Sequence, residues 1–245
     1  MKFLGVIPAR YSSTRFPGKP LESINGKSMI EWVYKRTIES DLDKVIVATD
    51  DERIYNEVIS FGGEAILTSK EHETGTDRIA EVSAKYPEYE VIINIQGDEP
   101  LIEKSMINSL IAPFIEDLDL KMATLKFKLD NIEDVNNPNI VKVITDNNDY
   151  AIYFSRSPIP YPRHMDMKNY YKHIGIYAYE REFLLGYSKL KQTPLEISES
   201  LEQLRVLENG YKIKVIETKN KIIGVDTKED LEKLINYINE KNITL

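Results

Sequence analysis

Hydrophobic and polar positions in the first half of the chain fall into blocks that predict short strands separated by amphipathic helices. The predicted strands are residues 2–7, 44–49, 64–67 and 91–95, and the helices between them are residues 28–39, 52–60 and 77–85. Ser28 and Glu31 have the spacing of a capping box, which marks the start of the first helix. This alternation predicts a mostly parallel sheet with helices on both faces and a ligand site at the carboxyl ends of its strands.

The middle of the chain is richer in strands. They are predicted at residues 122–129, 141–145, 151–156 and 173–179, with the proline-rich stretch "SPIPYPRH" (157–164) before the last of them. We expect one or two antiparallel strands and a protruding arm in this region. A helix at 194–210 ended by Gly210, a strand at 211–218 and a helix at 227–241 complete the chain. No repeat or linker divides the sequence, so we expect a single α/β domain over residues 1–245.

Charge and composition limit the classes of partner. The 245-residue chain of 28.3 kDa carries 40 acidic and 32 basic residues. This excess of acids argues against general binding to nucleic acid or to an anionic membrane, which needs a broad basic face. The absence of cysteine excludes disulfides, thiolate catalysis and zinc–sulfur sites, and three scattered histidines do not favour a histidine metal site. No apolar run approaches a membrane span, so we expect a cytoplasmic protein without a signal peptide or membrane insertion.

The loop after the first strand concentrates positive charge on this acidic background. The stretch "GVIPARYSSTRFPGKPL" leaves its strand at Pro8 and carries Arg10, Arg15 and Lys19. Small residues such as Ala9 would let a ligand approach the main chain, where the three cations would converge on a polyphosphate. A solvated loop whose cations balance acidic neighbours is an equally good interpretation of the composition. The loop matches neither the Gly-x-Gly-x-x-Gly turn nor the Gly-x4-Gly-Lys-Ser/Thr phosphate loop.

Two acidic residues are candidates for holding a metal. Asp98, in "INIQGDEPLI", comes after a buried strand and is placed to hold Mg²⁺ against phosphate oxygens. An ordinary Gly-Asp turn is the alternative. Asp226, in "GVDTKED", is a second candidate acid, but its spacing to Glu229 also suits a cap of the last helix.

Three further stretches leave a structural and a functional interpretation open. In "TGTDR" (74–78), Thr76 or Asp77 would cap a helix while Arg78 faces solvent, or the helix start would serve an anion. In "KHIGIYAY" (172–179), alternation places His173 and Tyr177 on one strand face, which is either a polar ligand wall or an exposed sheet face. In "ESLEQLR" (199–205), neighbouring polar residues on the predicted helix have an ordinary solvated pattern.

Taken together, these stretches resemble the 3-deoxy-manno-octulosonate cytidylyltransferases, also called CMP-Kdo synthetases. Further matching stretches are "VATDDERI", "FGGEAILTS", "YFSRSPIP" and "PLEISESLEQLRVLENGYKI", and all occur in the family's order over essentially the whole chain. The resemblance implies a nucleotide-diphospho-sugar transferase-like α/β fold, with residues 122–180 including sugar-binding strands and a homodimer arm. It also implies the reaction of CTP with 3-deoxy-D-manno-octulosonate (Kdo), assisted by Mg²⁺, to give CMP-Kdo and pyrophosphate for lipopolysaccharide.

The resemblance also implies a role for each matching position. The catalytic set is Arg10, Arg15, Lys19, Asp98 and Asp226, of which Asp98 and Asp226 hold the metal. CTP is expected to contact Pro8, Ala9, Arg10, Arg15, Lys19, Thr74, Gly75 and Arg78. Kdo is expected to contact Arg78, Gln96, Arg156, His173, Tyr177, Glu202 and Gln203. Glu73 departs from the pattern, since a small residue is expected before Thr74.

The chemistry that the resemblance implies suits the residues present. The 2-hydroxyl of Kdo would attack the α-phosphorus of CTP, and such a transfer depends on positioning and charge neutralisation. Two Mg²⁺ ions would fit, one orienting the triphosphate and one activating the hydroxyl. Alternatives are a cytidylyltransferase for 8-amino-Kdo or another acidic sugar such as sialic acid, and a non-catalytic nucleotide-binding protein on the same fold. An Asp-x-Asp glycosyltransferase is not favoured, because "DLD" (117–119) follows a helix instead of a strand.

Overall fold

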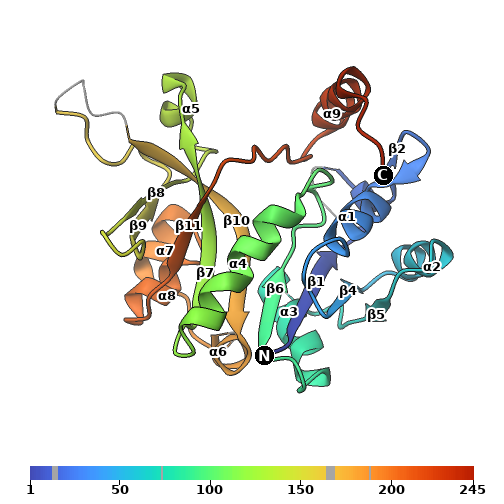
Figure 1. Ribbon diagram of the computed structural model, residues 1–245, viewed down its shortest axis with the longest axis horizontal. Coiled ribbons are helices and arrows are strands. Elements are labelled where there is room, and N and C mark those ends of the chain that lie inside the picture. The colour runs from blue at the N-terminus through green and yellow to red at the C-terminus, as the bar shows by residue number, and fades with distance from the viewer. Residues whose placement is uncertain (13–15, 73, 164–168, 188) are drawn as a thin grey trace. The chain divides into compact units, whose positions relative to one another are not determined.

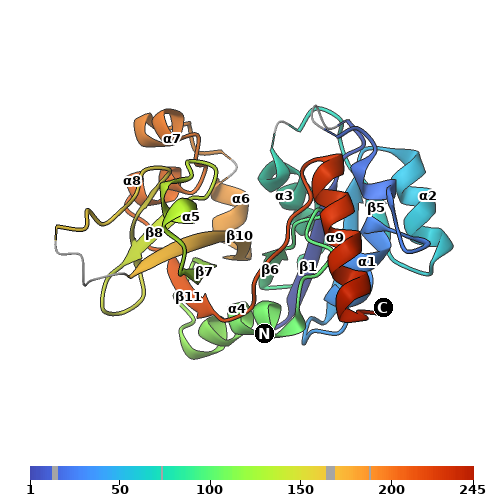
Figure 2. The same cartoon turned by 90° about the horizontal axis from the view of Figure 1, so that it is seen from above.

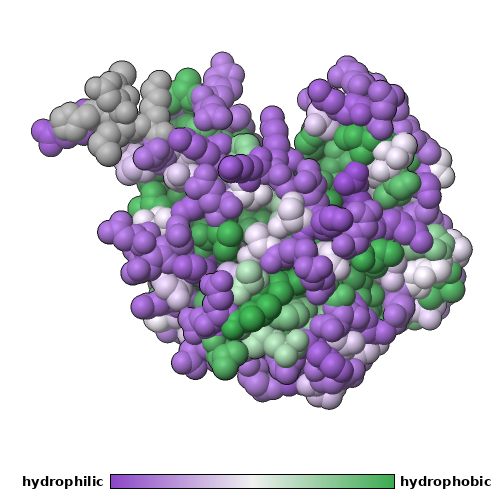
Figure 3. All heavy atoms as spheres, in the orientation of Figure 1, coloured by the Kyte–Doolittle hydropathy of each residue, from purple (hydrophilic) through white to green (hydrophobic). Residues whose placement is uncertain are grey.

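The computed structural model describes residues 1–12, 16–72, 74–163, 169–187 and 189–245. The chain forms two compact units: unit 1 comprises residues 1–108 and 222–245, and unit 2 comprises residues 109–221. A single domain over residues 1–245 therefore stays a prediction. Within the described part of the chain, no helix has the length and hydrophobicity needed to cross a membrane. Hydrophilic side chains cover most of the face shown in Figure 3, as the charged composition predicts.

Unit 1 contains a four-stranded parallel sheet in the order β6–β1–β4–β5 (Figure 1). Its strands are β1 (Phe3–Ala9), β4 (Lys44–Thr49), β5 (Ala65–Leu67) and β6 (Val91–Asn94). In the register of the sheet, Val6 of β1 lies between Ile46 of β4 and Asn94 of β6. The strands are nearly continuous in apolar residues because helices bury both faces of such a sheet. The predicted parallel core is confirmed.

The helices of unit 1 are distributed over the two faces of its sheet (Figures 1 and 2). The helices are α1 (Met29–Thr37), α2 (Glu52–Ser60) and α3 (Gly75–Lys85), to which the chain adds α9 (Lys228–Lys241) near its end. Figures 1 and 2 show α1 and α2 on one face and α3 on the other. The chain thus changes direction in the sheet between β1 and β6. In open α/β sheets, ligands bind outside the carboxyl ends of strands at such a point.

Helix α9 lies beside α1 and ties the last segment of the chain to the first loop (Figure 2). Trp32 of α1 and Leu234 of α9 are buried in one apolar cluster with Phe16 of the loop after β1 and Val225. Between this loop and α1 lie the short helix η1 (Lys19–Leu21) and the hairpin strands β2 (Ser23–Ile24) and β3 (Lys27–Ser28). The cluster therefore holds the loop after β1 against the segment that precedes α9.

Unit 2 is built on a mixed sheet. Strand β7 (Met122–Leu129) pairs in parallel with β11 (Lys214–Thr218) and antiparallel with β10 (Tyr170–Glu180). Strands β8 (Lys142–Thr145) and β9 (Ala151–Ser155) pair antiparallel with each other, and β8 also pairs with β10. The helices of this unit are α5 (Ile132–Asn136), α6 (Arg181–Tyr187), α7 (Pro194–Glu199) and α8 (Leu204–Glu208), and the boundary between the units falls within α4 (Lys104–Glu116). The predicted antiparallel region is confirmed.

The single helix predicted at residues 194–210 is wrong. The structure has two short helices, α7 and α8, separated at Ser200, which adopts the left-handed conformation at φ 52°. The guanidinium of Arg156 binds the carbonyl oxygens of Glu199 and Ser200, so a side chain distant in sequence satisfies the end of α7. Local helix signals could not reveal this partner.

Candidate active site

Lys19 lies where the loop after β1 meets two acidic residues. Gly18 adopts a left-handed conformation at φ 75°, and its N–H donates to the Tyr11 carbonyl at 2.8 Å, which turns the chain into η1. The Lys19 ammonium then donates to Asp98 Oδ2 at 2.8 Å and lies 3.6 Å from Asp226 Oδ1. It also donates to the Val225 carbonyl at 2.8 Å. The structure thus brings together three of the residues predicted for catalysis.

Asp98 is held at the carboxyl end of β6 by two close backbone approaches. A Cβ atom on Gly97 would lie 2.9 Å from the Pro8 carbonyl oxygen, so only glycine fits beside the end of β1. The Val225 N–H donates to the Asp98 carbonyl at 2.9 Å, which joins this turn to the segment before α9. The position of Asp98 therefore depends on both neighbouring segments.

Replacing Gly97 with alanine is expected to displace the turn that carries Asp98. The added Cβ would meet backbone atoms, which cannot move as a side chain can, and such overpacking typically costs about 1–3 kcal/mol of unfolding free energy. Thermal unfolding and a turnover assay measure the two effects. The matched control is Gly186→Ala in α6, where nothing lies within 4 Å of the added Cβ. Equal stability of the two variants would show that Gly97 is not needed for the close approach.

Asp226 does not cap α9. The N-cap is Thr227, whose hydroxyl accepts the Asp230 N–H at 3.2 Å while the Asp230 carboxylate accepts the Thr227 N–H at 3.0 Å. The predicted alternative of an Asp226–Glu229 cap is therefore wrong, because the capping box begins one residue later. The Asp226 side chain is half-exposed and faces the Lys19 ammonium.

Asp98 and Asp226 suit a magnesium ion that is shared with phosphate groups. Their oxygens approach one ammonium group, so the two carboxylates and the Val225 carbonyl already surround a position for a cation. Mg²⁺ is usually bound through one or two carboxylates and substrate phosphates. Among the described residues, no group of three or more His, Cys, Asp or Glu side chains could hold a metal alone. The residues present fit Mg²⁺ together with a polyphosphate.

The other residues predicted to bind nucleotide gather at the end of β1 and the start of α3. Pro8 and Ala9 end β1 and Arg10 follows it, while Arg15 lies outside the described residues. A Cβ on Gly75 would lie 3.8 Å from the Pro8 ring, which places the first turn of α3 beside the end of β1. Thr74 is the N-cap of α3. A helix N-terminus at this position favours an anionic ligand.

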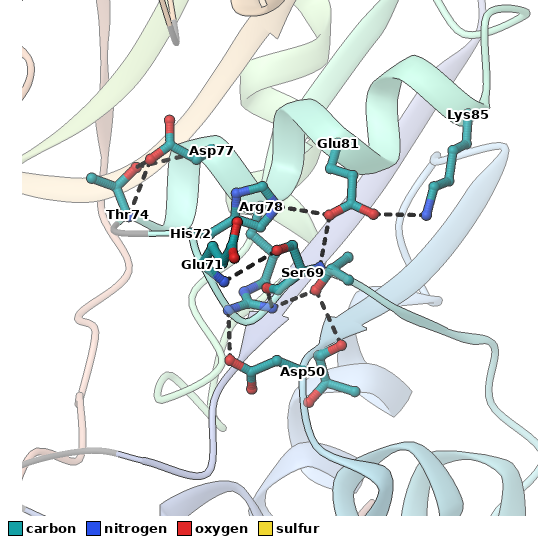
Figure 4. Close-up of polar contacts among 11 residues, drawn as sticks. Asp50, Ser69, Glu71, His72, Thr74, Asp77, Arg78, Glu81 and Lys85 are labelled. Atoms are coloured by element: carbon teal, nitrogen blue, oxygen red, sulfur yellow. Dashed lines mark hydrogen bonds and ion pairs between the residues drawn. The ribbon is translucent and has the colours of Figure 1, made fainter.

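Arg78 is buried instead of facing solvent, and Figure 4 shows its polar contacts. Its guanidinium donates to Asp50 Oδ2 at 2.9 Å, to the Ser69 carbonyl at 3.3 Å and to the hydroxyl of Thr68. The interpretation in which Arg78 faces solvent is therefore wrong, because it fills the space between α3 and the ends of β4 and β5. The cap of α3 is Thr74, paired with Asp77. Contact of Arg78 with nucleotide or sugar stays a prediction.

Glu81 is a supporting residue that the sequence analysis missed. Its carboxylate accepts from the Ser69 N–H at 2.9 Å and from Lys85 at 2.8 Å, and it lies 2.7 Å from His72 Nε2 (Figure 4). Partial burial opposes ionisation, but these hydrogen bonds outweigh it and hold the Glu81 pKa at about 2. Only the Glu81–Lys85 spacing was visible in the sequence. Glu81 and Arg78 together anchor the segment that leads from β5 to Thr74.

Replacing Glu81 with glutamine is expected to remove a pH-dependent part of the stability. The folded-state pKa of about 2 lies below the ordinary value of 4.5, so the stabilisation is present above pH 4.5 and is lost as the pH falls towards 2. For a side chain that is one-quarter exposed we expect a loss of about 1–3 kcal/mol at pH 7. Urea unfolding at several pH values measures it, with the exposed Glu88→Gln as control. If the free energy of unfolding depended on pH in the same way for Glu81→Gln and the wild type, Glu81 would not be the source of the pH-dependent stability.

In unit 2, the side chains of His173, which is buried, and Tyr177, which is partly buried, lie beside each other on β10. A bulge between Ile174 and Tyr177 interrupts the pairing with β7, and the rings of His173 and Tyr177 are 5.4 Å apart. The His173 Nε2 atom lies 3.1 Å from the Thr124 hydroxyl. Burial, and to a smaller extent Lys172, lowers the pKa of His173 to about 3, so its imidazole is neutral at physiological pH. The alternative of an exposed sheet face is wrong.

Glu202 and Gln203 lie in the turn between α7 and α8, not within a helix. The Tyr187 hydroxyl donates to the Glu202 carbonyl at 2.9 Å. Burial first, and then the Glu202 carboxylate, raise the pKa of Tyr177, which indicates that the two side chains are near each other. Gln203 is 5% exposed, and its Nε2 atom has no hydrogen-bond partner among the described residues. A buried amide donor of this kind is available to a ligand.

Arg156 follows β9 and donates to three backbone carbonyls. Its acceptors are Glu199 at 2.7 Å from Nε, Pro138 at 3.1 Å from Nη1 and Ser200 at 3.3 Å from Nη2. Arginine has five N–H donors, so each terminal nitrogen keeps one N–H that no described residue accepts. A pair of N–H groups of this kind can bind a carboxylate.

The predicted site residues therefore fall into both units. Unit 1 holds Pro8, Ala9, Arg10, Lys19, Thr74, Gly75, Arg78, Gln96, Asp98 and Asp226, while unit 2 holds Arg156, His173, Tyr177, Glu202 and Gln203. Among them, Lys19 contacts both acids and His173 contacts Tyr177. Gln96 lies in the turn after β6, where its carbonyl accepts the Glu99 N–H at 3.2 Å.

Comparison with known proteins identifies the family. The profile of the family described as cytidylyltransferase matches residues 4–215. A 3-deoxy-manno-octulosonate cytidylyltransferase of Fusobacterium nucleatum subsp. nucleatum is 69% identical over 245 residues, covering 100% of both chains. A protein of the same name from Geobacter metallireducens is 50% identical over 99% of this chain and 100% of its own.

Solved structures agree with this result. The structure of a CMP:2-keto-3-deoxy-manno-octonic acid synthetase complexed with CTP matches with a TM-score of 0.95 at 44% identity, covering 98% of this chain and 100% of that one. A putative glucose-1-phosphate thymidylyltransferase from Bacillus anthracis shares the fold at 16% identity, with a TM-score of 0.68 over 99% of this chain and 97% of its own. The chain belongs to the 3-deoxy-manno-octulosonate cytidylyltransferase family.

Proposed function

We propose that the protein transfers CMP from CTP to Kdo and releases pyrophosphate. The observation that carries this proposal is the cluster of Lys19, Asp98 and Asp226 at the carboxyl ends of β1 and β6, in a chain of this family. One cation and two carboxylates at this point match the needs of a triphosphate that arrives with Mg²⁺.

In the proposed reaction, the 2-hydroxyl oxygen of Kdo forms a bond to the α-phosphorus of CTP. The bond from this phosphorus to the bridging oxygen of the β-phosphate breaks, pyrophosphate leaves, and the hydroxyl proton passes to solvent. Positioning and charge neutralisation supply most of the acceleration in such a transfer. Mg²⁺, when bound with CTP, would neutralise phosphate charge and make the hydroxyl more acidic.

Lys19 has two roles in this proposal. Without substrate its ammonium holds Asp98 and Asp226 together, and with CTP bound it donates to the triphosphate while the two acids hold Mg²⁺. Arg10 and Arg15 complete the positive charge around the phosphates, and the first turn of α3, which begins at Gly75, contributes backbone N–H groups, while the Thr74 N–H is held by the Asp77 carboxylate. A cluster of this kind explains why an acidic protein places cations in its first loop.

The sugar acid is proposed to bind residues of unit 2. The two remaining N–H groups of Arg156 suit its carboxylate, and the unpaired Gln203 amide suits a hydroxyl. The neutral imidazole of His173, the hydroxyl of Tyr177 and the carboxylate of Glu202 add polar atoms to this site. A cytidylyltransferase for 8-amino-Kdo or another acidic sugar is the alternative, since those sugars also carry a carboxylate.

The test of the sugar site is the Arg156→Lys variant. Lysine keeps the charge but loses the planar pair of donors, so we expect the KM for Kdo to rise about tenfold while the KM for CTP stays within about twofold. An unchanged KM for Kdo would remove Arg156 from the proposed site.

We further propose a cytoplasmic homodimer that supplies CMP-Kdo for lipopolysaccharide synthesis. Unit 2 has an open groove of about 580 Å³ lined by Leu129, Asp130, Asn131, Ile132, Val135, Pro162 and Tyr170, beside the exposed Tyr161 of the predicted arm. Its apolar lining supports contact with a second copy of the chain. Light scattering should give twice the 28.3 kDa of one chain, and Ile132→Lys should reduce this mass. A mass of 28.3 kDa for the wild type would contradict the dimer.

A further inference from the structure

Lys142 is a fully buried cation that the proposed chemistry does not use. It begins β8, its side chain has no exposed surface, and no carboxylate of the described residues lies within 4.0 Å of its ammonium. Instead, the ammonium donates to the carbonyls of Asn137 at 3.0 Å, Ile140 at 2.6 Å and Arg156 at 2.5 Å. An ammonium group has three donors, so all of them are satisfied by backbone oxygens.

A charge buried in this way is costly, and its surroundings must compensate for the lost hydration. Burial lowers the pKa of Lys142, and the nearby Glu199 carboxylate partly opposes this effect. The three carbonyls belong to two separate segments, the turn at residues 137–140 and the residue that follows β9. The ammonium therefore fastens these two segments to each other.

Both fastened segments determine where the guanidinium of Arg156 points. Lys142 binds carbonyls on either side of Pro138, and the Pro138 carbonyl is itself an acceptor for Arg156 Nη1 at 3.1 Å. Lys142 also holds the carbonyl of Arg156, whose N–H donates to Glu199 Oε2 at 2.9 Å. The backbone of Arg156 and one end of its side chain thus depend on the same buried ammonium.

We propose that Lys142 is a positioning residue for recognition of the sugar acid. By fixing the turn at 137–140 and the backbone of Arg156, it sets the direction of the two guanidinium N–H groups that meet the carboxylate. The inference rests on the proposed function, in which Arg156 binds that carboxylate. It assigns to a fully buried lysine a specific effect on the binding of one of the two substrates.

The experiment compares Lys142→Met with Lys126→Met. Lys126 lies on β7 of the same unit and is 5% exposed, but its ammonium binds Thr145 at 3.0 Å and Asp149 at 2.8 Å, with no link to Arg156. Both variants lose a buried ammonium. For Lys142→Met we expect the KM for Kdo to rise about tenfold with the KM for CTP within about twofold, since small displacements of a binding group are costly. For Lys126→Met both KM values should stay within about twofold of the wild type.

A second readout follows Arg156 directly and does not depend on the sugar. In the wild type, the Arg156 Nε–H is hydrogen-bonded to Glu199 and should give a protected ¹⁵N–¹H signal, assigned by its loss in Arg156→Lys. This signal should broaden or disappear in Lys142→Met and persist in Lys126→Met. If Arg156→Lys leaves the KM for Kdo unchanged, Arg156 does not bind the sugar acid. The NMR signal then still shows whether Lys142 positions the Arg156 side chain.

Lys142→Gln serves where Lys142→Met does not fold, because glutamine retains two of the three donors. We expect it to raise the KM for Kdo about threefold and to weaken the Arg156 signal, in line with partial repair of the site. A folded variant at position 142 with a wild-type Arg156 signal and a wild-type KM for Kdo would overturn the inference.

Discussion

Replacing Lys19 with alanine is expected to lower kcat/KM by about 10²–10³-fold. An oriented donor that acts on transition-state charge contributes about 2.7–4 kcal/mol, and Lys19 is placed to act on the triphosphate. Removing it also leaves Asp98 and Asp226 without the ammonium that lies 2.8 Å and 3.6 Å from their oxygens. Pyrophosphate release at varied CTP concentration measures the loss.

The control for Lys19 is Lys27→Ala in the same unit. Lys27 is largely exposed and pairs with Glu31 at 2.9 Å, away from the acids, so its loss should change kcat/KM by less than about twofold. A near-normal rate for Lys19→Ala would exclude the phosphate-binding role of the loop after β1.

Asp98→Asn and Asp226→Asn are each expected to abolish Mg²⁺-dependent turnover while the fold stays intact. Asparagine keeps the shape of aspartate but loses the charge that a hard divalent cation requires, and we expect a fall in kcat of about 10³-fold or more. The melting temperature of Asp226→Asn should hardly change, because Thr227 and Asp230 cap α9 without its carboxylate. Turnover against Mg²⁺ concentration and thermal unfolding measure the two effects.

For Asp230→Ala we expect the opposite of the result for Asp226→Asn, namely reduced stability with retained turnover. The substitution removes the carboxylate that accepts the Thr227 N–H at 3.0 Å, so it should lower the stability by about 0.5–2 kcal/mol while turnover is retained. If Asp226→Asn behaved like Asp230→Ala, losing stability but keeping turnover, Asp226 would be a structural residue.

Local sequence signals were sufficient for most elements of unit 1. Strand β4 and helix α2 have the bounds that the apolar blocks predict, and Ser28 caps α1 as its spacing indicates. These features depend on periodicity and on residues a few positions apart. The break between α7 and α8 depends on Arg156, more than forty residues earlier, and no local pattern contains that information.

In the candidate site, too, some features could be predicted from the sequence and others depend on residues distant in the chain. Asp98 had a local signal, since it comes directly after a buried strand, whereas Asp226 joined Lys19 and Asp98 in the predicted site only through the family resemblance. The structure places Lys19 in contact with both acids. The burial of Arg78 was not predicted, because it depends on Asp50 and on Thr68 from neighbouring connections. Lys142 was missed for the same reason, since its partners are backbone carbonyls that carry no sequence signal.

The most direct test of the proposed function is pyrophosphate release by the purified protein with Mg²⁺. CTP is compared with ATP, GTP and UTP, and Kdo with 8-amino-Kdo and sialic acid. We expect release only when CTP and Kdo are both present, with loss of activity on chelation of Mg²⁺. Release with another nucleotide or only with another sugar, or none with CTP and Kdo, would contradict the proposal.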